Sequence, residues 1–194
     1  MVIFNSIFVL LALLLSGMLA LPSPDNTRNY HEGDDHEEDR HDRDCLTDNE
    51  ARFLADTFKY FYIRLDPRLV EKYMAPDFHD YSDSYISLYL NGSKALGSPV
   101  SASRDEFIQN HFVDPPVYPE GSPNWFILED IFHTCTKISF RWVLEPDGTF
   151  NIGPLPIRGN NVMHTVKRDG KWLMKAEWSE FNTYAWAQNL GVCA

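Results

Sequence analysis

Apolar residues recur at helical spacing in the first half of the chain and at strand spacing in the second half. Within residues 47–66, Leu54, Phe58, Phe61 and Leu65 lie three or four positions apart, so one side of a helix would be apolar. The segment is therefore predicted to form an amphipathic helix of about five turns.

Start and stop signals mark the ends of three predicted helices. A serine or threonine with a glutamate three residues later forms a capping box, which satisfies free N–H groups at a helix start. Two such boxes predict helices that begin near Thr47 and near Ser103. Between them, Asp66 caps a short helix over residues 66–76, which Pro76 ends.

From Trp125 onward the apolar period changes to two. This alternation predicts strands over residues 124–135 and 137–148 and a hairpin over 159–182, whose turn lies at 168–170. A helical turn closes the chain. Three helices followed by a meander of long strands predict an α+β fold, with the N-terminal helices packed on a strongly curved antiparallel sheet.

The first 44 residues begin with an apolar segment and end with a charged one. Residues 1–20 are mainly apolar, with small residues at their end, and predict a secretory signal peptide cut near Ala20. The alternative is a membrane anchor, because the run is about long enough to span. After cleavage no membrane contact is expected, and residues 45–194 are predicted to form one extracellular domain.

An acidic segment follows the predicted signal peptide. Residues 31–44 hold eight carboxylates and two arginines, and so carry −6 of the net charge of −11. Residues 31–44 have no apolar side chain, and residues 21–44 are predicted to be disordered. Three histidines recur every fifth residue there, but this spacing matches no closed set of metal ligands, and no metal or other cofactor is expected. The negative charge argues against a nucleic-acid partner.

The chain has three cysteines, Cys45, Cys135 and Cys193. Cys45 and Cys193 bracket the domain, and a disulfide between them is predicted in an oxidising compartment. Cys135 is then expected to be a buried free thiol, although an odd cysteine count leaves other pairings open. An Asn-Gly-Ser sequon makes Asn91 a candidate for glycosylation.

Several stretches of residues 45–194 resemble the secreted fungal branch of the nuclear transport factor 2-like superfamily. They are CLTDNEA, APDFHDYSDS, FRW and WSEFNTYAWAQNLG. The superfamily includes SnoaL-like cyclases, scytalone dehydratase and ketosteroid isomerase. The resemblance implies a cone, in which the sheet wraps around the first long helix and its open end holds an apolar pocket. Its enzymes place acid–base groups on that wall, and its members often dimerise through the outer sheet face.

Strand alternation selects acid–base candidates in the hairpin. Trp172, Met174, Ala176, Trp178 and Glu180 share one face, which is expected to point inward. A carboxyl at the end of such a stripe is a plausible acid or base, although Glu180 could also lie at the rim or accept bonds from a helix start near Asn182.

His164 is expected to share that wall with Glu180, with a buried structural histidine as the alternative. Four further residues are candidate ligand contacts. Trp142 and Trp178 would supply aromatic surface. Arg141 lies on the face opposite Trp142 and could instead form a structural ion pair. His133 could face the pocket mouth or solvent.

The stretch PDFHDYSDSY, residues 76–85, is the densest cluster of polar candidates. Phe78, Asp80 and Ser82 fall on one side of an extended segment, and the residues between them on the other. Tyr81 and Asp83 are the preferred catalytic candidates, because superfamily enzymes often use such residues from this region. The alternative is that these polar groups cap turns.

Two functions remain from the sequence. One is a cofactor-independent isomerase, cyclase or dehydratase acting on a small apolar molecule, with Asp83 or Glu180 as base, His164 as proton shuttle and Tyr81 as oxyanion donor. The other is a secreted binding protein without turnover, whose tryptophans fill the cone. A homodimer through the mixed outer face is a further possibility. That face is expected to carry Ser139, Arg141, Val143, Met163, Thr165, Leu173 and Lys175.

Overall fold

The first long helix forms the centre of the core. The computed structural model describes residues 45–90, 92–112, 126–146 and 153–192. Helix α2 spans Asp48–Ile63 and begins at the predicted capping box, where Thr47 and Glu50 each accept a hydrogen bond from the other's backbone N–H. Its buried face carries Leu54, Phe58 and Phe61, which confirms the predicted amphipathic helix.

Among the described residues, four shorter helices accompany α2. They are α3 (Pro67–Tyr73), α4 (Asp83–Leu88), α5 (Arg104–Phe112) and α6 (Thr183–Asn189). The helix predicted over 66–76 ends earlier than expected, because the chain becomes extended at Met74 and Pro76 lies inside a strand. Helix α4 was not predicted. It begins where the Ser82 hydroxyl accepts a hydrogen bond from the Tyr85 N–H.

Six strands form one sheet in the order β2–β1–β6–β5–β4–β3. They are β1 (Met74–Tyr81), β2 (Pro99–Ser101), β3 (Phe126–His133), β4 (Lys137–Leu144), β5 (Ile157–Arg168) and β6 (Lys171–Phe181). β1 and β6 are parallel, whereas the other four neighbouring pairs are antiparallel. The α+β prediction is confirmed, and the antiparallel sheet is corrected at the pair that joins the two halves of the chain.

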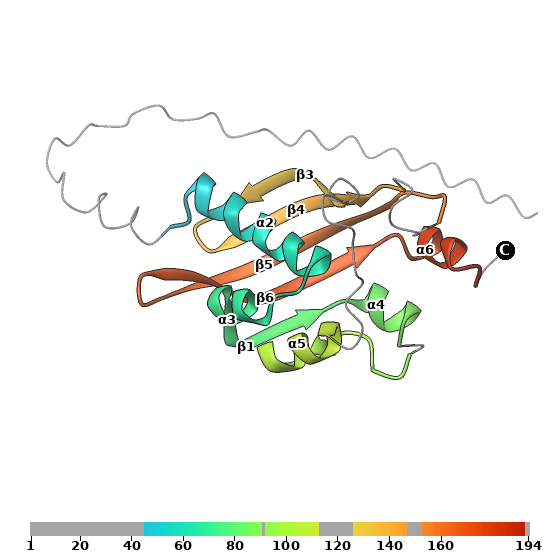
Figure 1. Cartoon of the computed structure of the whole chain (residues 1–194), viewed down its shortest axis with the longest axis horizontal. Coiled ribbons are helices and arrows are strands. Elements are labelled where there is room, and N and C mark those ends of the chain that lie inside the picture. The colour runs from blue at the N-terminus through green and yellow to red at the C-terminus, as the bar shows by residue number, and fades with distance from the viewer. Residues whose placement is uncertain (1–44, 91, 113–125, 147–152, 193–194) are drawn as a thin grey trace, which may run out of the picture. The chain divides into compact units, whose positions relative to one another are not determined.

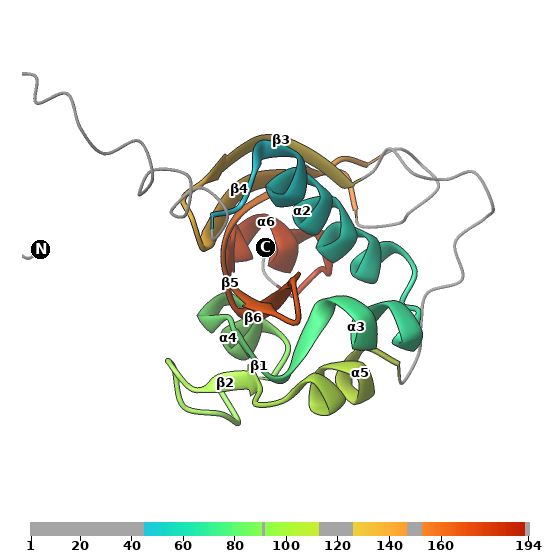
Figure 2. The same cartoon turned by 90° about the vertical axis from the view of Figure 1, so that its left-hand side faces the viewer.

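The sheet is strongly curved. Figure 2 shows it as an arc, with α2 and α3 along its open side and α5 beside β1. In Figure 1, α2 runs across β3, β4 and β5, and α6 lies at the far end of β6. Phe58, Phe107, Phe140, Met163 and Met174 are fully buried between the helices and the inner face of the sheet. No helix among the described residues is both long and apolar enough to cross a membrane.

One extra residue in β6 reverses the faces that its side chains occupy. Thr165 pairs with Met174 but His164 pairs with Ala176, so Lys175 is a bulge. Before the bulge Met174 points inward, and after it Glu177 does, with no exposed surface. The expectation of one inward stripe from Trp172 to Glu180 is therefore wrong beyond the bulge, because the alternation shifts by one position.

The faces of β5 also differ from the expectation. Met163 is fully buried and Thr165 is nearly so, whereas Val162 is exposed. Met163 and Thr165 therefore do not belong to the outer face, and His164 lies on the outer side instead. Asn161 is buried although it is polar, whereas its neighbour Val162 is exposed. The burial of Asn161 is possible because its amide group has hydrogen-bond partners inside the protein.

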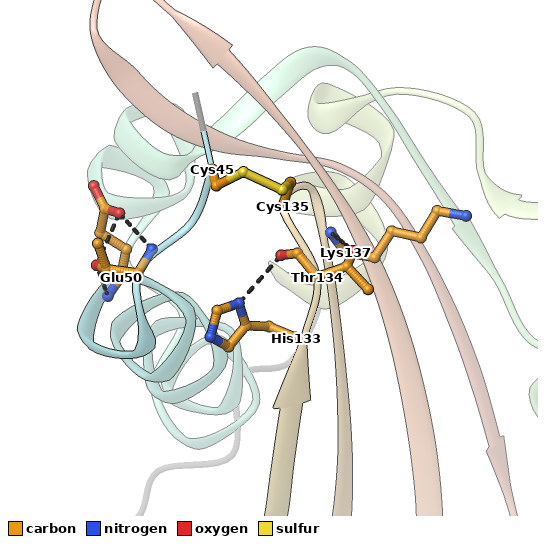
Figure 3. Close-up of a disulfide and its surroundings, with 7 residues drawn as sticks. Cys45, Glu50, His133, Thr134, Cys135 and Lys137 are labelled. Carbon is orange, nitrogen blue, oxygen red and sulfur yellow. Dashed lines mark hydrogen bonds between the residues drawn. A yellow bond between two sulfur atoms is a disulfide. The ribbon is translucent and has the colours of Figure 1, made fainter. Parts of the chain in front are cut away.

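The disulfide joins Cys45 to Cys135, which corrects the predicted pairing. Figure 3 shows the bond linking the segment before α2 to the turn after β3. The Leu46 N–H donates to the Cys135 carbonyl over 3.0 Å, so the two segments are already paired through their backbones. The strand assigned to Cys135 ends at His133, which leaves the cysteine in an exposed turn. Cys193, like Asn91 and residues 1–44, lies outside the described residues.

Removing the disulfide should destabilise the domain. The bond closes a loop with a sequence separation of 90 residues. In the chain-entropy model a loop of this length contributes about 4 kcal/mol. Cys45→Ser and Cys135→Ser should each lower the free energy of unfolding in urea by roughly that amount. Cys193→Ser is the control and should keep the disulfide. Peptide mapping that finds Cys193 bonded to Cys45 would refute the assignment.

Candidate functional site

A cavity of about 250 Å³ opens inside the curve of the sheet. All six strands of the sheet and helices α2, α4, α5 and α6 contribute to its wall. Most of the lining side chains are aromatic or aliphatic, and a few are polar. They are Tyr62, Asp80, Ser82, Tyr85, Tyr89, Val100, His111, Phe126, Trp142, Leu144, Asn161, Ser179, Phe181 and Trp186. The predicted apolar pocket is therefore present, with polar groups concentrated on β1, β5 and β6.

Two buried carboxyl groups lie side by side at this wall. Asp80 of β1 and Glu177 of β6 are register partners in the parallel pair, and a hydrogen bond between their side chains contributes to the pKa shifts of both. Asp80 is 4% exposed and lines the cavity, whereas Glu177 is fully buried behind it. Neither carboxylate can donate, so a proton must sit between the two groups.

Asn161 fixes the orientation of Glu177. The Trp142 indole N–H can only donate, and it donates to Oδ1 of Asn161. The Ser179 hydroxyl donates to the same oxygen over 3.2 Å. The Asn161 amide must therefore turn its N–H₂ group toward Glu177, where it donates to Oε1. Oε2 of Glu177 is buried and accepts no hydrogen bond from a donor of the described residues, which leaves it for a proton shared with Asp80.

Gly159 allows the tryptophan of this network to take its place. It is the register partner of Trp142 across β4 and β5. A Cβ atom at Gly159 would lie 2.2 Å from Cζ2 of the Trp142 indole, which is far inside van der Waals contact. Only glycine lets the ring lie this close to the backbone, in reach of Asn161.

Burial sets the protonation of the pair. It raises the pKa of Glu177 well above its usual range, and the neighbouring charge of Asp80 raises it further. Burial also raises the pKa of Asp80, while the hydrogen bond from Glu177 opposes that rise. Glu177 is therefore the protonated partner and donor, and Asp80 is the member that presents a carboxylate to the cavity.

Two phenols and an imidazole surround Asp80. Burial raises the pKa of Tyr62 well above its usual value and raises that of Tyr85, and the Asp80 charge adds to both shifts. Both tyrosines are therefore neutral O–H donors near the carboxylate. Burial lowers the pKa of His111, whose Nδ1 donates to the Phe107 carbonyl over 2.9 Å. A neutral His111 then keeps Nε2 as its acceptor.

Three of the predicted site residues lie together on the outer face of the sheet. The rings of Tyr81 and Trp178 are stacked with their centroids 5.1 Å apart, and His164 lies 4.6 Å from Trp178. His164 and Trp178 are thus neighbours, as their shared face predicted, but the bulge in β6 puts that face outside the cavity. Tyr81 points outward because it alternates with the inward Asp80.

Asp83 and Glu180 hold the start of α4. Glu180 accepts hydrogen bonds from the N–H groups of Asp83 and Ser84, at 3.0 and 2.9 Å. The Asp83 carboxylate in turn accepts from the Gly97 N–H at 2.6 Å. The position of both carboxylates fits the capping alternative, although Glu180 caps a helix other than the one suggested by sequence.

Of the four predicted ligand contacts, the structure places Trp142 in the cavity wall. Arg141 is on the outer face, where it pairs with Glu129 at 3.2 Å and with Asp130 at 3.4 Å. His133 lies beside the start of α2, where its Nε2 is 2.7 Å from the Asp48 carboxylate. Figure 3 shows His133 next to the disulfide. Among the described residues, no three His, Cys, Asp or Glu side chains are placed to hold a metal ion together.

Sequence reasoning missed the polar groups that meet in the cavity. The alternation groups Asp80 with Phe78 and Ser82 without saying which side is inward, and Tyr81 and Asp83 are preferred over it; the structure buries the side that carries Asp80. Glu177 was assigned outward because strict alternation ignores the bulge. Asn161 offers one signal, because it is a polar residue two positions before the apolar Met163 on the same face of the strand. Its place next to Glu177 follows from the pairing of β5 with β6 only once the bulge is known.

Comparisons with known proteins agree with this architecture. Residues 44–193 match the family model of the NTF2-like domain. A candidate polyketide cyclase from Bacillus cereus is similar, with a TM-score of 0.50 and 18% identity over 77% of this chain and 87% of that one. A candidate isomerase of the SnoaL-like family from Agrobacterium tumefaciens has a TM-score of 0.46 and 12% identity, covering 69% and 98%.

An NTF-2 like protein of unknown function from Silicibacter pomeroyi has a TM-score of 0.44 and 11% identity, covering 76% of this chain and 100% of that one. The search of curated proteins gave no match. At 18% identity, the likeness to the Bacillus cereus protein shows a shared fold and nothing further.

Glu177→Gln should remove a loss of folding stability that grows as the pH rises. The folded-state pKa of Glu177 is raised, so above the unfolded value the folded chain binds more protons and its stability falls as pH rises toward the folded pKa. Glutamine can still accept from Asn161 and donate to Asp80. The variant should therefore melt higher than the parent at pH 8, by about 2–4 °C for each kcal/mol gained, and match it near pH 4.

Glu71→Gln is the matched control, because it makes the same chemical change on an exposed side chain of α3. Its melting temperature should follow that of the parent from pH 4 to pH 8, measured by calorimetry. A Glu177→Gln variant that loses stability at pH 8 would contradict the shared proton.

Glu180→Ala should unfold more easily, because it leaves the first N–H groups of α4 without their acceptor. The expected loss in urea is about 1–2 kcal/mol, as for other removed helix caps. Glu71→Ala, on an exposed position, should cost less than about 0.5 kcal/mol. Equal stabilities of the two variants would show that Glu180 does not stabilise α4.

Proposed function

The chain belongs to the NTF2-like domain family, and we propose that it is an acid–base enzyme that needs no cofactor. It would move a proton on a small, largely apolar molecule held in the cavity, during an isomerisation, cyclisation or dehydration. The observation that carries the proposal is the Asp80 carboxylate, which lines an aromatic cavity and is hydrogen-bonded from behind by a protonated Glu177. Such perturbed carboxyl pairs are concentrated at functional sites.

Asp80 is assigned the role of general base. Burial raises its pKa, which brings its basicity closer to that needed for proton transfer near neutral pH. Glu177 is a positioning residue, since it is separated from the cavity and acts through its hydrogen bond to Asp80. The proton taken from the substrate would rest on Asp80 and return to another atom of the same substrate, or leave with water in a dehydration.

Tyr62 and Tyr85 are assigned the role of hydrogen-bond donors to the substrate oxygen that gains negative charge. When a proton leaves the carbon next to a carbonyl group, negative charge develops on the carbonyl oxygen. Tyr62 and Tyr85 keep their protons, because burial and Asp80 raise their pKa values, and so remain hydrogen-bond donors. Neutral His111 supplies a second acceptor for a proton in transit.

The proposal includes action outside the cell. The Cys45–Cys135 disulfide is typical of an oxidising compartment, and the apolar residues 1–20 have the pattern of a secretory signal. A protein that binds its ligand without turnover is the second candidate, supported by the aromatic side chains that dominate the wall.

Hydrogen–deuterium exchange tests the proposed chemistry without knowledge of the natural substrate. A panel of small aryl and cyclic ketones would be incubated with the protein in D₂O, and loss of the C–H signal next to the carbonyl followed by NMR. The parent should accelerate exchange for at least one ketone. Asp80→Asn should lower that rate by about 10²- to 10⁴-fold, the usual contribution of a general base.

Asp56→Asn is the matched control, because it removes one carboxylate from the exposed face of α2. It should exchange at the parental rate. Equal rates in the parent and in Asp80→Asn would refute the assignment of the base. Saturable quenching of tryptophan fluorescence by the ketones, without any exchange, would favour the binding protein over the enzyme.

A further inference from the structure

The Asp80 carboxylate meets no cation in the cavity wall. Among the described lining residues there is no lysine or arginine, and burial holds the pKa of His111 below its usual value, so that side chain is neutral. Lys94 acts on Asp80 electrostatically, but its ammonium group is bonded to the carbonyls of Pro99 and Val100, at 3.2 and 2.7 Å, and pairs with Glu106.

The partner of Asp80 does not supply the missing charge. Within the described part of the chain, Asp80 interacts through a hydrogen bond with the buried Glu177, which brings a second carboxyl group rather than a positive charge. A buried carboxylate without a counter-charge is costly, and a ligand that carried one would offset that cost.

The rings around Asp80 suit the same ligand. Tyr62 and Tyr85 lie close enough to Asp80 for its charge to act on both phenols. Tyr89 stacks on Tyr85 with centroids 4.9 Å apart, and Trp186 meets Tyr89 edge to face at 5.5 Å. The faces of tyrosine and tryptophan rings attract cations, and a ring of them beside a carboxylate is a common way to bind an ammonium group.

We infer that the cavity binds small organic cations, in which an aliphatic ammonium group meets Asp80 and an apolar body lies against the aromatic wall. The cavity volume of about 250 Å³ is near the lower end of ligand pockets, so the ligand is small. An anion of the same shape would face Asp80 without a counter-charge and should be rejected. A neutral isostere should bind through its apolar body alone.

This inference is independent of turnover. It concerns what the cavity holds, and it stands if no ketone exchanges its protons. If the protein is an enzyme, an ammonium group on Asp80 would occupy the base, and organic cations should inhibit exchange competitively.

Three ligands of one shape test the inference. They are 3-phenylpropylammonium, 3-phenylpropan-1-ol and 3-phenylpropanoate, titrated into the full chain at pH 7 by calorimetry and by fluorescence of the cavity tryptophans. The ammonium compound should bind at least tenfold more tightly than the alcohol, and the carboxylate should show no saturable binding. Asp80→Asn should weaken ammonium binding at least tenfold while leaving the alcohol unchanged.

Two controls separate the site from general attraction. The chain has a net charge of −11, which attracts any cation. Asp56→Asn has the same net charge as Asp80→Asn and should keep the parental preference. Glu71→Gln removes an exposed carboxylate of α3, away from the cavity lining, and should keep it as well. Equal binding of the ammonium compound and the alcohol by the parent, a preference that survives Asp80→Asn, or no saturable ammonium binding would each overturn the inference.

Discussion

The proton held between Asp80 and Glu177 constrains the rest of the site. Two carboxylates cannot both ionise in an aromatic wall without a large desolvation cost and mutual repulsion. One proton removes the repulsion, and the complete burial of Glu177 favours that group as its holder. The Asn161 amide donates to Oε1 of Glu177, which lowers the pKa of that carboxyl but fixes its orientation and leaves Oε2 free for the shared proton. The amide is held in turn by Trp142, whose ring requires a glycine opposite it.

This arrangement exists because β6 contains one residue more than its partner. The bulge at Lys175 moves Glu177 to the inner face and Trp178 to the outer one. β-Bulges commonly redirect a side chain next to a functional site, and here one places a carboxyl where regular alternation would place an apolar residue. The same shift gathers Trp178, Tyr81 and His164 into a stack outside the cavity, so the inner and outer sets of polar and aromatic groups share one cause.

Most of the fold follows from local pattern, whereas the site does not. The spacing of Leu54, Phe58 and Phe61 and the capping box at Thr47 were enough to place α2. The hairpin turn was also predictable from the Asp-Gly pair at residues 169–170. In the structure, Asp169 and Gly170 adopt the positive φ angles, 51° and 74°, that such a turn requires. These features depend on residues near one another in sequence.

The cavity depends instead on contacts between distant strands. Nothing in the sequence of β6 reveals that Lys175 is unpaired, since the bulge is defined only against β5. The parallel pairing of β1 with β6, which brings Asp80 to Glu177, joins segments about 100 residues apart and has no local signal. The cysteine pairing failed for a similar reason, because an odd count fixes no partner.

The acidic stretch around β1 separates into structural and functional carboxylates by the donors each one meets. Asp77 lies on the outer side, where it pairs with Arg168 at 3.1 Å and with Lys175. Asp83 receives a backbone N–H, and Glu180 opposite it receives two. Each of these charges is therefore satisfied by the protein itself.

Asp80 differs, because its partner is another acid and its remaining acceptor capacity faces the cavity. A fold gains no stability from such an arrangement, since burial raises the pKa of both members and so makes the native state less stable as pH rises. An arrangement that costs stability yet is held by a four-residue network of Trp142, Asn161, Ser179 and Glu177 is best explained by what enters the cavity. Whether that molecule gives up a proton to Asp80 or brings a positive charge to it, the same carboxylate is the point of contact.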